Sequence, residues 1–113
     1  MTTINGVNFG EVLQEATNAA RAAASGDWEQ IKDIVDNVGK AIVNDIEHVA
    51  KQKANGTLDE YGAKIFMEDQ RIVARVRLRS VAIMTAKLAE DVLNAMITVF
   101  QTAINTALGW TIF

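Results

Sequence analysis

The hydrophobic pattern between Thr57 and Leu108 has a helical period and changes sides halfway along the run. At about 100° per residue, six apolar residues of the first half share one face: Leu58, Ile65, Phe66, Ile72, Val73 and Val76. In the second half the apolar face is roughly the opposite one: Val92, Leu93, Met96, Ile97, Phe100, Ala103, Ile104 and Ala107. A helix that is apolar on two sides needs neighbours on both sides.

Two earlier helices are predicted from the signals at their ends. Asn8 suits the cap of a short, alanine-rich helix over about 9–24, and Ser25-Gly26-Asp27 separates that helix from a second one over 27–54. The second helix has the most regular apolar pattern of the chain, with steps of three or four residues: Trp28, Ile31, Val35, Val38, Ile42, Ile46 and Val49. After Asn55-Gly56, Thr57 and Glu60 form a predicted capping box for the next helix.

These elements predict an all-α fold in a single domain over residues 1–113. Because the connection around Gly56 is short, the second helix and the following run should form an antiparallel helical hairpin. Neither glycine nor proline interrupts residues 63–108, so we predict one very long C-terminal helix over 58–108, with the short N-terminal helix beside it. The alternative is a compact four-helix bundle in which the run breaks near Ser80.

The composition offers few groups for catalysis. The chain has no cysteine and one histidine, and it contains neither a nucleophile elbow nor a glycine-rich phosphate loop. A dinuclear carboxylate site needs paired Glu-x-x-His motifs, whereas Asp45 stands three residues before His48. We therefore expect a protein that is not an enzyme and has no catalytic residue, metal site or cofactor.

Arginines between positions 71 and 79 form the only basic concentration, and Arg71, Arg75 and Arg79 lie on one stripe. The net charge is −3 and no aromatic residue is interleaved with these arginines, which disfavours nucleic-acid binding. When the antiparallel hairpin is folded about Gly56, the stripe falls near Asp33 and Asp36 of the preceding helix. We therefore predict an ion-pair network, with binding of an anionic partner as the alternative.

Residues 92–113 contain no charged side chain. Their apolar arc predicts a contact surface formed by Val92, Met96, Val99, Phe100, Ala103 and Ile104. An exposed arc of this size requires a partner, so we predict a self-associating or partner-binding protein, either a homo-oligomer or bound to a helical protein. The opposite stripe is polar but neutral: Asn94, Thr98, Gln101, Thr102 and Asn105.

The alternative function is a membrane-active helical protein that inserts residues 92–113, a segment long enough to span a bilayer core. The amides of Asn94, Gln101 and Asn105 make this alternative less favourable, because they are costly in lipid. The N-terminus has neither a basic region nor a continuous apolar stretch, so no signal peptide is expected. A cytoplasmic location is the default expectation, and export without a leader stays open.

Overall fold

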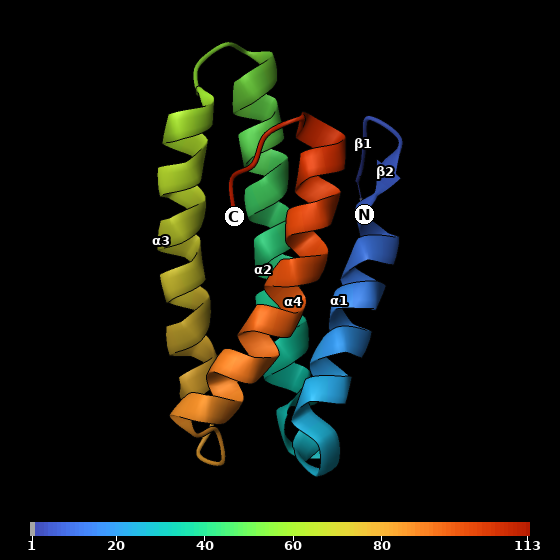
Figure 1. Cartoon of the computed structure of the whole chain (residues 1–113), viewed down its shortest axis with the longest axis vertical. Helices are drawn as coiled ribbons and strands as arrows, with labels where there is room; N and C mark the ends of the chain where they lie inside the picture. The colour runs from blue at the N-terminus through green and yellow to red at the C-terminus, as the bar shows by residue number, and fades with distance from the viewer. Residues whose placement is uncertain (1) are drawn as a thin grey trace.

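The computed structural model describes residues 2–113, which form four α-helices and a small N-terminal hairpin (Figure 1). The elements in chain order are β1 (Thr3–Ile4), β2 (Val7–Asn8), α1 (Phe9–Ala24), a 3₁₀ turn η1 (Ser25–Asp27), α2 (Trp28–Ala54), α3 (Glu60–Arg79) and α4 (Ala86–Leu108). The all-α class is confirmed. The two short strands were not predicted.

The N-terminal hairpin leads directly into α1. Asn5 and Gly6 both have positive φ angles, of 47° and 82°, as a two-residue type I′ turn requires. This turn pairs β1 with β2 in antiparallel register, with Ile4 opposite Val7. The Asn8 side chain then accepts hydrogen bonds from the backbone N–H groups of Gly10 and Glu11, at 2.9 and 3.3 Å. The predicted cap of the first helix is therefore confirmed.

The continuous helix predicted over 58–108 is wrong, because residues 80–85 form a turn that separates α3 from α4. The Ser80 hydroxyl donates to the carbonyl of Arg77 at 2.6 Å. The Thr85 hydroxyl oxygen caps α4 by accepting from the Leu88 N–H at 3.1 Å. The chain reverses here without glycine or proline, and this course agrees with the compact alternative that breaks near Ser80.

The start of α3 also differs from the prediction. Asp59 caps this helix by accepting from the Gly62 N–H at 2.7 Å, whereas the Thr57 hydroxyl donates to the carbonyl of Gln52 at 3.1 Å. Thr57 therefore closes the turn after α2 and does not form a capping box with Glu60. Asp59 is the better placed acceptor because it directly precedes the first helical residue.

The core lies mainly between α1, α2 and α4, and α3 lies at the edge of the bundle away from α1 (Figure 1). Buried Ala16, Ala20 and Ala24 leave little side-chain bulk on α1, so α4 packs closely and antiparallel beside it. Gly39 marks a close approach of three helices. A Cβ atom added there would lie 2.6 Å from Leu13 Cδ1 and 3.4 Å from Met96 Cε.

The segment after α4 folds back over the bundle. Gly109 ends α4 with a φ of 70°, and Ile112 is buried. The Thr111 N–H donates to Glu60 Oε2 at 3.1 Å, and Lys53 Nζ lies 5.0 Å from the centroid of the Trp110 ring. These contacts join the C-terminal tail to the ends of α2 and α3.

Candidate functional site

The contact surface predicted on α4 lies largely in the core. Val92, Met96, Phe100 and Ile104 are fully buried, and Val99 and Ala103 are half-buried. The prediction that these six residues form an exposed surface is therefore wrong for four of them. Its physical reason is that α1 already covers this arc, since the turn at 80–85 lets α4 run back along the bundle.

A shallow groove of about 430 Å³ remains where α4 meets α1. It is lined by Val7, Val12, Glu15, Thr98, Val99, Thr102, Ala103 and Thr106. The hydroxyls of Thr98, Thr102 and Thr106 donate to backbone carbonyls four residues earlier in α4. These donors are therefore engaged within the helix, and the groove offers few polar groups that converge on a ligand.

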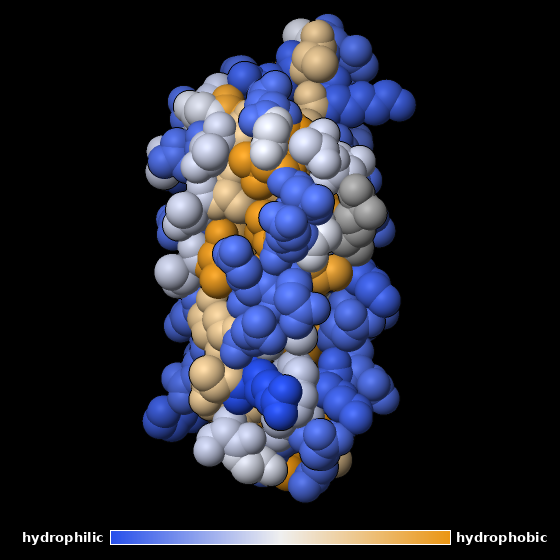
Figure 2. All heavy atoms as spheres, turned by 90° about the vertical axis from the view of Figure 1, so that its right-hand side faces the viewer, coloured by the Kyte–Doolittle hydropathy of each residue, from blue (hydrophilic) through white to orange (hydrophobic). Residues whose placement is uncertain are grey.

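Exposed apolar residues concentrate on α3. Among residues 2–113, every large hydrophobic residue that is exposed lies on this helix: Tyr61 (73%), Ile65 (45%), Ile72 (55%), Val73 (40%) and Val76 (65%). We call these five residues the α3 outer face. By contrast, Figure 2 shows the side on which α1 lies, where hydrophilic residues cover most of the surface and hydrophobic ones appear between them.

The α3 outer face is exposed because the opposite side of α3 packs on the bundle. The buried residues of α3 are Ala63, Met67, Ala74 and Leu78, and this narrow apolar side contacts α2 and α4. Tyr61, Ile65, Ile72 and Val76 follow one another at intervals of four, seven and four residues, which places them on a single side of a helix. The helix thus has two apolar sides, one buried against the bundle and the other between 40% and 73% exposed.

Two of the three arginines predicted to form a stripe contact α4. Arg71 Nη2 donates to Asn94 Oδ1 at 2.9 Å, and Arg75 forms an ion pair with Glu90. The hydrogen bond from Arg75 lowers the pKa of the Glu90 carboxyl. Arg79 is exposed near the end of α3.

The ion pairs predicted between this stripe and Asp33 or Asp36 are therefore not formed by Arg71 and Arg75. Asp36 pairs instead with Lys40 on its own helix, at 2.8 Å. The arginines meet α4 because the chain turns back after Ser80 and runs along α3, a neighbour that the straight-helix prediction did not include.

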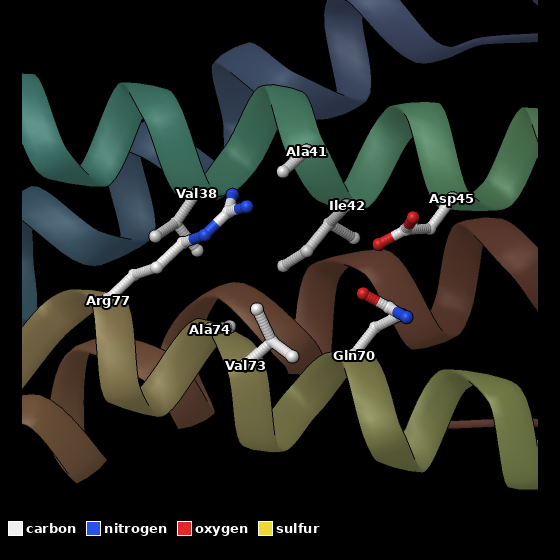
Figure 3. A pocket seen from close by; sticks show the side chains of 8 residues that line it. All are labelled: Val38, Ala41, Ile42, Asp45, Gln70, Val73, Ala74 and Arg77. Atoms are coloured by element: carbon white, nitrogen blue, oxygen red, sulfur yellow. The ribbon is translucent and has the colours of Figure 1, made fainter.

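A small polar pocket lies between α2 and α3, with a volume of about 70 Å³. Asp45 and Gln70 approach one end of it and Arg77 the other, and Val38, Ala41, Ile42, Val73 and Ala74 complete the lining (Figure 3). Burial raises the pKa of the Asp45 carboxyl, and the charges of Arg77 and His48 act in the opposite direction. The pocket is far smaller than the roughly 300 Å³ at which small-molecule sites begin.

Within residues 2–113, histidine and carboxylate side chains nowhere gather in groups of three or more that could hold a metal ion. Over the same residues, each helix is too short or too polar to cross a membrane.

Comparison with known proteins adds no family. No family model matches this sequence, and no curated protein or solved structure is significantly similar to it. The α3 outer face is therefore the candidate site on the strength of its own geometry.

Proposed function

We propose that this protein is a non-enzymatic helical module that self-associates through the α3 outer face. One observation carries the proposal, namely that all the exposed large hydrophobic residues of the described chain lie on one helix. Single exposed apolar side chains are ordinary on protein surfaces, whereas several of them gathered on one side of one helix are typical of an interaction site.

The composition of the face supports protein contact. Tyr61 is its most exposed member, and tyrosine is enriched in protein interfaces because its ring buries a large area at a small cost in side-chain entropy. Ile65, Ile72 and Val76 add branched side chains that lose little rotamer freedom on burial. Burial of this face would contribute about 25 cal/mol for each Å² of apolar surface removed from water, from which the entropy cost of association is subtracted.

The membrane-active alternative requires a larger rearrangement. The apolar arc of α4 is buried against α1, so insertion of residues 92–113 into a bilayer would first require these helices to separate. Self-association through α3 requires no such change, and we therefore favour it.

The test is the mass in solution, measured by light scattering over a range of protein concentrations. We expect the mass to rise toward twice the 12.3 kDa of one chain. The Ile72→Glu variant should remain at the mass of one chain with unchanged helical circular dichroism, because a buried unpaired charge opposes the contact.

A matched control places the same charge on the exposed side of α4. Thr102 is exposed, and Thr102→Glu should associate as the unmodified protein does. A mass of one chain at all concentrations for the unmodified protein would refute the proposal. Equal association of the Ile72→Glu variant would also refute it.

A further inference from the structure

We infer that two copies of the chain pack antiparallel through α3, with a two-fold axis that crosses the helix between Glu68 and Asp69. This inference rests on the proposed function and specifies the partner, the orientation and the register. It is carried by two features of α3, the spacing of the apolar residues and the distribution of charge.

The apolar residues of the α3 outer face are spaced symmetrically along the helix. Tyr61 lies as many residues before the midpoint between Glu68 and Asp69 as Val76 lies after it. Ile65 and Ile72 likewise lie at equal distances on the two sides of this midpoint. When a second α3 is turned end to end, Tyr61 faces Val76 of the second copy and Ile65 faces its Ile72. A two-fold interface requires this self-complementary arrangement of one surface patch.

Charge along α3 favours the antiparallel orientation over the parallel one. Residues 60–69 contain three acidic residues and one lysine, for a net charge of −2, whereas residues 70–79 contain four arginines and no acidic residue. Arg71 and Arg75 are engaged with Asn94 and Glu90 of α4, so the exposed Arg77 and Arg79 supply the positive charge available to a second copy. The antiparallel orientation places the acidic half of each helix beside the basic half of the other copy. The parallel orientation would place like charges together, and complementary charge sets orientation and register in protein interfaces.

The position of α3 in the bundle permits this contact. The helix lies at the edge of the molecule along its long dimension (Figure 1), and its 20 residues correspond to about 30 Å at 1.5 Å per residue. Two bundles can therefore lie side by side with their α3 helices in contact over the length of the α3 outer face.

Carboxylates near the axis limit the strength of the contact. Glu68 and Asp69 are exposed, and in the antiparallel pair both residues of each copy would lie close to their counterparts. Like charges at this distance repel. The inferred dimer is therefore held by its apolar residues, oriented by the charges at its ends and weakened at its centre.

Disulfide trapping tests the orientation, because the chain contains no cysteine. The variants Tyr61→Cys and Val76→Cys replace the two most exposed members of the face, so neither should disturb the fold. In the antiparallel pair these positions face each other, whereas two copies of residue 61 lie fifteen residues apart, about 22 Å along the helix. A disulfide needs Cβ atoms about 4 Å apart.

We expect a mixture of the two variants under mild oxidation to form the mixed cross-linked dimer. One variant carries a longer tag, so that the mixed dimer separates from the two symmetric ones on a non-reducing gel. Each variant alone should cross-link at least tenfold less. A Thr102→Cys variant on α4 gives the background level of cross-linking.

The other outcomes are distinguishable. If each variant cross-links alone and the mixture gives no mixed dimer above background, the helices are parallel, which overturns this inference and leaves the proposed function standing. If every combination cross-links only at the background level while the unmodified protein has a dimeric mass, the contact lies elsewhere. This outcome overturns the α3 contact altogether. A monomeric mass for the unmodified protein overturns self-association itself.

Discussion

α3 and α4 arise from one run of sequence, and each has a strongly apolar side, but only α4 buries that side within the chain. The arc of α4 is covered by α1, where alanines allow the two helices to approach closely. The α3 outer face is 40–73% exposed, with Val73 also lining the pocket shared with α2, and α3 attaches to the bundle mainly through its other, narrower apolar side. Apolar patterning thus indicates which sides of a helix favour burial, whereas the course of the chain decides which of them are covered within the chain.

The two helices also differ in the character of their attachment. The α1–α4 contact is a close apolar one. Around α3, the contacts include the Arg71–Asn94 hydrogen bond, the Arg75–Glu90 ion pair and the polar pocket at Asp45. Exposed pairs of this kind contribute little to stability, typically less than about 1 kcal/mol each. We therefore expect the core around α4 to dominate the free energy of unfolding.

The largest expected effect comes from truncation of a buried residue of α4. Phe100→Ala should lower the free energy of unfolding by about 3–5 kcal/mol, because it leaves a cavity in the core. At a concentration low enough to keep the chain monomeric, Ile72→Ala on α3 should change it by less than about 1 kcal/mol. Urea denaturation of the two variants measures the difference. Similar losses at both positions would show that the α3 outer face is not free in the monomer.

The next effect concerns association. Ile65→Ser on α3 should raise the dissociation constant of the dimer by about tenfold to a hundredfold, since a two-fold interface loses two isoleucines at once and each 1.4 kcal/mol is a factor of ten. Sedimentation equilibrium measures this constant. The control is Val99→Ser, a half-buried position on α4. A greater weakening by the α4 substitution would reverse the roles assigned to the two helices.

A smaller effect of opposite sign is expected at the centre of the α3 contact. Asp69→Asn should tighten the dimer several-fold, because it removes like charges near the two-fold axis, and the gain should shrink in high salt. Asp33→Asn removes an exposed carboxylate from α2 and serves as the control for net charge. If Asp33→Asn tightens the dimer as much, the effect belongs to net charge and not to the register.

The smallest effect concerns the attachment of α3 to α2. The raised pKa of Asp45 means that its neutral form is favoured in the folded protein, so its contribution to stability is present at low pH and is lost as the pH rises through the folded-state pKa. Asp45→Asn should therefore raise the melting temperature slightly at pH 7 and leave it unchanged at pH 3. Differential scanning calorimetry at both pH values checks this. A lower melting temperature at pH 7 would show that attraction to Arg77 outweighs the cost of burial.

Local signals in the sequence predict part of this fold well. The regular apolar steps of α2 and the cap at Asn8 depend on residues within one turn of each other, and both lie where the pattern indicates. The break before α4 was given only as the alternative, because it uses Ser80 and Thr85 in place of glycine or proline. Thr85 directly before a helical segment is a favoured cap residue and could have indicated it.

The candidate site was harder to predict because it depends on long-range packing. The apolar side of the first half of the run was evident from the sequence. The second side, Ala63, Met67, Ala74 and Leu78, has the same helical spacing, but two of its four residues are alanines, which mark a buried side less clearly than larger residues do. This second side is the one that packs on the bundle, since small side chains let α3 approach α2. The larger apolar side is left outside as a result.

The most direct test of the central claim is a series of amide NMR correlation spectra recorded while the protein is diluted. We expect signals from the α3 outer face, Tyr61 to Val76, to shift with concentration, whereas signals from Val92 to Ile104 of α4 stay in place. Concentration-dependent shifts centred on α4, or an absence of shifts along α3, would contradict the central claim.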